Sequence, residues 1–80
     1  MIAHELSTSP VRVELANAIR AVNARHAEVG APESAQLKAA WVRLDKSLSL
    51  AVLAGEDAAA RRAVDNYRAE ALAAIEQAAR

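Results

Sequence analysis

Residues 37–54, LKAAWVRLDKSLSLAVLA, decide the fold of this chain of 80 residues. Placed on a helix, the larger apolar side chains recur every three or four positions and form one continuous stripe. The stripe consists of Leu37, Trp41, Leu44, Leu48, Ala51 and Val52. Although SLSLAVL alternates as a half-buried strand does, the longer helical period before it favours a helix. This segment is therefore predicted to be the helix around which the rest of the chain packs.

A second apolar patch lies on nearly the opposite side of the same predicted helix. It contains Val42, Leu50 and Leu53, together with Ala35 and Ala39, and only Lys46 and Ser49 interrupt it. A helix that is apolar on two sides is either enclosed in its own fold or shared with a partner. The patch therefore predicts a self-association interface, most simply that of a two-fold homodimer. The alternative is that an N-terminal arm, residues 1–9, covers the patch with Ile2 and Leu6.

Two further helices are predicted, one on either side of this segment. Gly30 and Gly55 mark the ends of the first and second helices, because glycine readily adopts the left-handed conformation that closes a helix. Pro10 and Pro32 suit the first position of a helix, where the missing N–H is not needed. The two short connections favour antiparallel neighbours.

The predicted fold is all-α, a small antiparallel three-helix bundle whose helices span about residues 10–29, 32–54 and 57–79. Residues 10–80 are expected to form a single helical domain after the arm. A chain of this length buries a modest share of its surface, so its core is marginal unless it is very well packed or shared. Oligomerisation is one way to complete such a bundle.

The composition argues against several classes of protein. Ten basic residues balance ten acidic ones, so no overall charge attracts nucleic acid or anionic lipid. The chain has no cysteine, which excludes disulfides, thiolate zinc sites and thiol nucleophiles. No apolar run approaches the ~20 residues that cross a bilayer, and the first residues lack the pattern of a secretory signal. We therefore expect a cytoplasmic protein with no cofactor, no metal and no membrane contact.

Residues capable of catalysis do not form a recognisable arrangement. Ser47 lies near Asp45 and Lys46, but side chains one or two positions apart on a helix point in different directions. His26 is the one titratable side chain on an apolar stripe. We interpret it as a half-buried histidine at the edge of the core with its polar tip in water, and the alternative is a pH-sensitive or catalytic imidazole. The chain is thus predicted not to be an enzyme.

Two residues outside the second patch also bear on binding. Trp41, at the centre of the main stripe, is predicted to fill the core, and the alternative is that it serves as a binding hot spot. Leu72 is a candidate contact residue, because it lies off the apolar stripe predicted for the third helix, which consists of Ala60, Val64, Tyr67, Ala71, Ile75 and Ala78. The predicted protein interface comprises Val42, Lys46, Leu50, Leu53 and Leu72.

The sequence thus indicates a non-enzymatic protein that acts by binding another protein and by forming a homodimer. Its richness in Ala and Arg is typical of a GC-rich bacterial or phage genome. One version of this expectation is a phage or mobile-element protein that binds and modulates a host protein. The alternative is a nucleic-acid-binding regulator that dimerises to assemble its basic residues. A helix-turn-helix centred on Gly55 fails, because Glu56 and Arg61 stand where core residues are needed.

Overall fold

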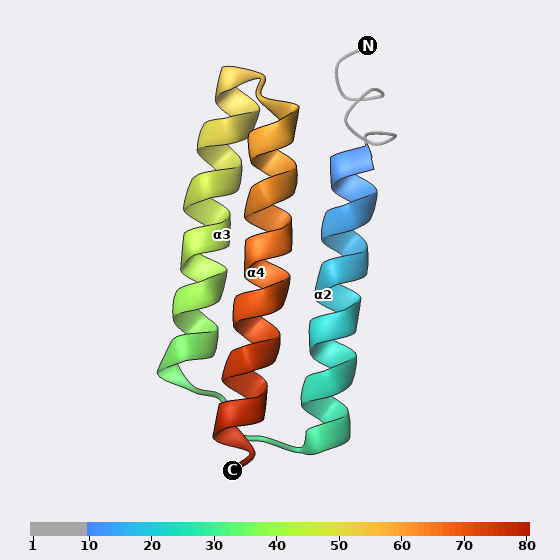
Figure 1. The fold of residues 1–80 in the computed structure, drawn as a ribbon, viewed down its shortest axis with the longest axis vertical. Helices are drawn as coiled ribbons and strands as arrows, with labels where there is room; N and C mark the ends of the chain where they lie inside the picture. Colours follow the sequence, from blue (N-terminus) through green and yellow to red (C-terminus); the bar gives the residue numbers. More distant parts are fainter. Residues whose placement is uncertain (1–9) are drawn as a thin grey trace.

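The computed structural model describes residues 10–80, which form three helices joined by two short turns (Figure 1). The helices are α2 (Pro10–Val29), α3 (Ala35–Ala54) and α4 (Asp57–Ala78). Helices that follow one another in the chain run antiparallel, which confirms the predicted three-helix bundle. The alternating SLSLAVL segment lies within α3 and is helical. The arm predicted for residues 1–9 lies outside the described residues.

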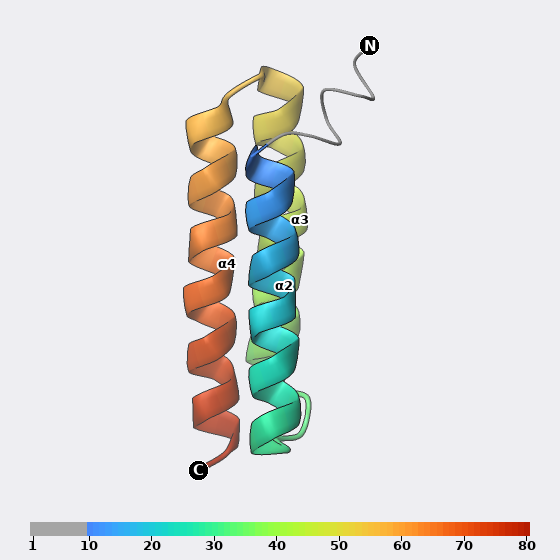
Figure 2. The ribbon, with the colours of Figure 1, turned by 90° about the vertical axis from the view of Figure 1, so that its right-hand side faces the viewer.

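Helix α4, rather than α3, is the element against which the other two helices pack. Figure 1 shows α4 between α3 and α2, and Figure 2 shows α2 and α3 on the same side of α4. Both α2 and α3 have Cα atoms within 8 Å of Cα atoms in α4, whereas no such pair joins α2 to α3. In cross-section the three helices therefore form a V with α4 at its apex.

The core of this bundle is built mainly from small side chains. Of the 13 buried apolar residues, the majority are alanines, and Ala71 of α4 is fully enclosed. The larger buried side chains are Val11, Val22, Leu44, Val64, Tyr67 and Ile75. Because helix axes approach more closely when the side chains between them are small, alanines on α4 let both neighbours lie near its backbone. The predicted stripe of α4 is confirmed from Ala60 to Ile75.

The end of α2 and both ends of α3 follow the capping rules, and the start of α3 differs from the predicted boundary. Gly30 and Gly55 both have φ of 70°, the left-handed conformation expected after a helix. Helix α3 begins at Ala35 instead of residue 32, because Ser34 is its N-cap. The Ser34 hydroxyl accepts a hydrogen bond from the Leu37 N–H at 3.1 Å, a stronger start signal than proline.

Ion pairs join α4 to each of its two neighbours. They lie at the outer edges of the α2–α4 and α3–α4 contacts, away from the space between α2 and α3. Arg25 of α2 donates to Glu76 of α4 at 2.7 Å, and Arg43 of α3 donates to Glu70 of α4 at 2.6 Å. The hydrogen bond from Arg25 holds the pKa of the Glu76 carboxyl below its ordinary value. These pairs are exposed and so contribute little stability. Within residues 10–80, no ion pair bridges α2 and α3.

Enlarging the side chain of Ala71 tests the close packing on α4. We expect Ala71→Leu to lower the free energy of unfolding by about 1–3 kcal/mol, because the added atoms have no space between the helices. Urea unfolding followed by circular dichroism measures this. Ala73→Leu, on the exposed side of the same helix, is the matched control and should change the value by about 0.5 kcal/mol or less. Equal losses in the two variants would contradict the packing described.

Candidate functional site

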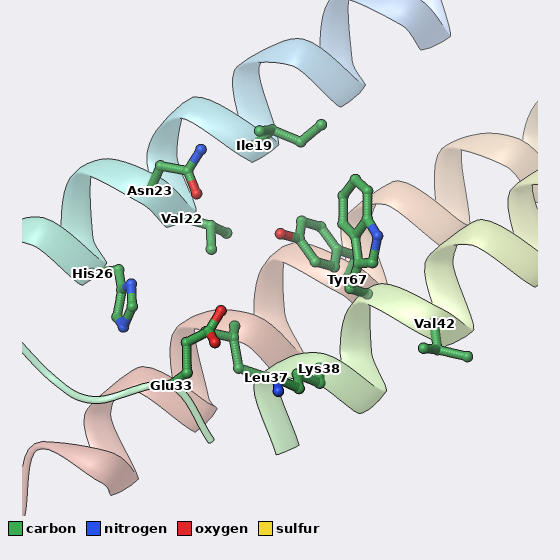
Figure 3. Close-up of a pocket in the computed structure, with 10 residues that line it drawn as sticks. Ile19, Val22, Asn23, His26, Glu33, Leu37, Lys38, Val42 and Tyr67 are labelled. Atoms are coloured by element: carbon green, nitrogen blue, oxygen red, sulfur yellow. The ribbon is translucent and has the colours of Figure 1, made fainter. Parts of the chain in front are cut away.

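A hollow lies between α2 and α3, at the end of the bundle where the chain passes from one to the other (Figure 3). Its volume is about 480 Å³. Ile19, Val22 and His26 line it from α2, Leu37 and Trp41 line it from α3, and Tyr67 of α4 forms its floor. It exists because α2 and α3 both pack on α4 and leave the space between themselves unfilled.

A second hollow, of about 270 Å³, lies between the same helices toward the opposite end. Val11 and Leu15 of α2 face Leu48 and Val52 of α3 across it, and Ala60 of α4 lies beneath. We call the two hollows together the interhelix groove. Its walls are mainly aliphatic and aromatic, and a few polar groups stand at its ends, which is the usual composition of a binding site.

Trp41 belongs to this groove and not to the core, so the predicted core position is wrong. Its side chain is 49 % exposed. The indole contacts Tyr67 edge-to-face, with ring centroids 5.6 Å apart. The physical reason is that α3 turns Ala40, Leu44 and Ala51 toward α4. The neighbouring edge of α3, which carries Trp41, finds no helix opposite it.

Two polar groups in the groove have no hydrogen-bond partner among the described residues. The Nε2 atom of His26 is shielded from solvent and makes no hydrogen bond. Tyr67 is 6 % exposed, and its hydroxyl points into the hollow in Figure 3. Burial raises the pKa of this hydroxyl above its ordinary value of 10.0. The half-buried position predicted for His26 is confirmed, but its Nε2 atom does not lie in water as predicted. Both groups offer hydrogen bonds that a ligand in the groove can use.

Charged residues stand at the mouth of the larger hollow. Glu33, in the turn before α3, directs its carboxylate into the hollow (Figure 3). No basic group in residues 10–80 lies within 4.0 Å of this carboxylate. Lys38 is exposed on the rim formed by α3. The hollow therefore combines an unpaired carboxylate with an aromatic floor.

The residues predicted as an interface form a separate exposed surface on α3, which we call the outer patch. It consists of Val42, Lys46, Leu50 and Leu53. The apolar members are 62 %, 61 % and 86 % exposed in sequence order, values that are high for residues of this type. Leu72 does not join them, because it is half-buried against the core on α4. Val42 also lines the larger hollow, so the outer patch and the groove meet along α3.

Within the part of the chain that the structure describes, the side chains considered for catalysis or metal binding are not brought together. Ser47 is exposed and forms no hydrogen bond with Asp45 or Lys46. No three His, Cys, Asp or Glu side chains of residues 10–80 gather as metal ligands do. Of the described helices, none has both the length and the apolar character needed to cross a membrane.

The groove is the feature that sequence reasoning missed. The helical stripes identify Trp41, Leu48 and Val52 as apolar but do not say which neighbour each one meets. The difference lies in the width of the buried arc, because α4 buries seven residues whereas α2 and α3 bury three each. An arc of this width indicates that α4 has two neighbours and that the other helices have one each.

Comparison with known protein families, with curated proteins and with solved structures finds no match to this chain. Its function is therefore inferred from its own residues.

Replacing Trp41 tests its place at the groove edge. We expect Trp41→Ala to remain folded and to lower the free energy of unfolding by about 1–2 kcal/mol, because half of the indole is already in water. Leu44→Ala removes a side chain that is buried between α3 and α4, and it should cost about 2–5 kcal/mol. Urea unfolding of both variants gives the comparison. A larger loss of unfolding free energy in Trp41→Ala than in Leu44→Ala would show that Trp41 is part of the core after all.

The raised pKa of Tyr67 predicts a loss of stability in alkali. The folded state favours the neutral phenol, so this contribution is complete below pH 10.0 and disappears as the pH rises through the pKa of the folded protein. Tyr67→Phe should be less sensitive to pH in this range. Because Tyr67 is the one tyrosine of the chain, ultraviolet absorbance reports its ionisation without interference from another phenol. A Tyr67 that ionises at its ordinary pKa would contradict this prediction.

Proposed function

We propose that the protein is a non-enzymatic binding protein of the cytoplasm that acts through protein–protein contacts and forms a homodimer through the outer patch of α3. The observation that carries this proposal is where the small and the large apolar side chains lie. Alanines fill most of the core, whereas Val42, Leu50 and Leu53 are exposed. Fully burying one such side chain stabilises a protein by about 1.5–3 kcal/mol. A partner that packs on this side of α3 would therefore bury these large side chains, which no described helix of the same chain covers.

The spacing of the outer patch supports a helix as its partner. Along α3, exposed or half-buried residues at positions 35, 39, 42, 46, 49 and 53 are separated by steps of four and three. This is the repeat of the contact seam in a coiled coil. Small side chains at Ala35 and Ala39 let a second helix approach closely at one end, and Leu53 supplies bulk at the other. A second copy of α3 has the same repeat and therefore matches it.

Lys46 supports an antiparallel arrangement of the two copies. In a parallel pair in register, Lys46 would face its own counterpart across the seam, and the two charges would repel each other. In an antiparallel pair that places Val42 opposite Leu53, Lys46 lies opposite Ser49.

The homodimer is tested by placing charges in the outer patch. We expect the wild type to dimerise in the micromolar range and Leu50→Glu with Leu53→Lys to remain monomeric, because the substitutions bury charge at the seam. Sedimentation velocity over a concentration series measures the association. The double variant should keep its helical circular dichroism, since both positions are exposed.

Val13→Glu is the matched control, because Val13 is an exposed apolar residue on α2, outside the patch. It should dimerise as the wild type does. A wild type that stays monomeric at high micromolar concentration would contradict the homodimer. A control that dissociates as fully as the double variant would show that the patch is not the interface.

The same samples separate this proposal from the nucleic-acid-binding alternative. Arg25, Arg43 and Arg61 each lie within 4.0 Å of a glutamate, so they are poorly placed to neutralise several phosphates together. We expect duplex DNA to bind weakly or not at all at physiological salt. Submicromolar binding with a steep dependence on salt would favour the regulator. The proposal extends to a phage or mobile-element protein that modulates a host protein, for which capture of a defined host partner is the test.

A further inference from the structure

We propose that the interhelix groove binds an amphipathic helix of a partner protein, and that a basic side chain of this helix, best an arginine, enters the hollow between Glu33, Trp41 and Tyr67. This inference rests on the proposed role in protein–protein contacts and adds the chemistry of the partner. It concerns the groove and is independent of the homodimer, which uses the outer patch.

The shape of the groove fits a helix. Helices α2 and α3 lie on the same side of α4 (Figure 2), and two hollows lie between them. A helix laid in this space would contact both of them and complete a four-helix bundle, in which each helix has two neighbours. The two hollows lie at successive positions along the groove, so the bound helix must present apolar residues over several turns.

The edges of the groove are free to receive such a helix. Exposed ion pairs close the outer edges of both helix seams, as with Arg25–Glu76 and Arg43–Glu70. Across the groove, no ion pair joins α2 to α3 within the described residues. Entry of a helix therefore breaks no charged contact. Trp41 and Val52 stand half-exposed along the α3 edge and would be covered by it.

The larger hollow selects a cation. The Glu33 carboxylate points into it and has no basic partner within 4.0 Å among residues 10–80. Trp41, which is half-exposed, can receive a guanidinium on its ring, and such cation–π contacts favour tryptophan and arginine. Guanidinium and carboxylate also pair through two parallel hydrogen bonds. An acidic side chain in the same place would face Glu33 and be repelled.

The unpartnered polar groups of the hollow suit the same ligand. The Tyr67 oxygen accepts a hydrogen bond, and neutral His26 accepts one at Nε2 when Nδ1 carries the proton. Arginine has five N–H donors and no acceptor, so it can satisfy these acceptors together with Glu33. The Nε2 atom of His26 is shielded from solvent, so water is a poor substitute partner there. Lys38, exposed on the rim, is the one basic residue that lines this hollow, and it lies beyond ion-pair distance of Glu33.

Trp41 provides a direct readout, because it is the one tryptophan of the chain and lies at the groove edge. The probe is a 20-residue helical peptide of Leu, Ala and Gln, without Trp or Tyr, carrying one arginine on its apolar edge. A matched peptide carries glutamine in its place. We expect the arginine peptide to shift the Trp41 emission to shorter wavelength and to bind about tenfold more tightly than the glutamine peptide.

Glu33→Gln should reduce this tenfold preference to less than about twofold and leave the affinity for the glutamine peptide unchanged. Glu56→Gln, in the turn before α4 and outside the groove, is the matched control and should keep the full preference. Circular dichroism checks that both variants fold. An unchanged preference in Glu33→Gln would overturn the cation site. A Trp41 emission that neither peptide alters at millimolar concentration would overturn the groove as a helix-binding site.

The titration is repeated on Leu50→Glu with Leu53→Lys, which leaves every groove residue in place. Peptide binding to this variant supports the groove whatever the sedimentation result for the outer patch. Loss of peptide binding in this variant, when the wild type binds, would overturn the independence of the two surfaces. A wild type that dimerises but does not bind either peptide would refute helix binding in the groove and leave the homodimer standing. Failure of one proposal can therefore be told from failure of the other.

Discussion

One helix, α4, packs against both of the others, and the rest of the structure follows from this constraint. Helix α4 buries an arc wide enough for both α2 and α3, and the alanines in that arc permit close contact on two sides. Alanine favours the helix but buries little area. The seams around Ala60, Ala63 and Ala71 are thus close-fitting but supply limited hydrophobic free energy, as expected for a domain of this size.

The same constraint decides where the large apolar side chains lie. Helices α2 and α3 each pack one side against α4 and do not contact each other. The apolar side chains that face the space between them therefore line a groove. Beyond the groove, α3 carries further apolar residues that no described element covers, among them Leu50 and Leu53. The two surfaces differ in kind: the groove is concave and has polar groups at both ends, whereas the outer patch is a row of side chains on a convex helix.

The local features of the fold were predictable from sequence, and the assignment of neighbours was not. Capping chemistry and apolar period give the helices, the glycine closures and the exposed second face of α3, because each depends on residues close together in the chain. The position of Trp41 depends on which side of α3 meets α4. An apolar stripe about 100° wide leaves that rotation undetermined, and Ala40 proved to be nearer its centre than Trp41. The groove depends on two such rotations and was missed.

The absence of contact between α2 and α3 has a consequence for how the chain opens. Since α2 has α4 as its one neighbour among the described helices, the seam between them is all that holds it. We expect α2 to open as a unit about the turn after Gly30, whereas α3 is also tied to α4 by the short turn at Gly55. Such a unit exchanges its amide hydrogens at a lower free energy than the α3–α4 hairpin does. It also allows α2 of one molecule to dock on α4 of another, which is the route to domain swapping.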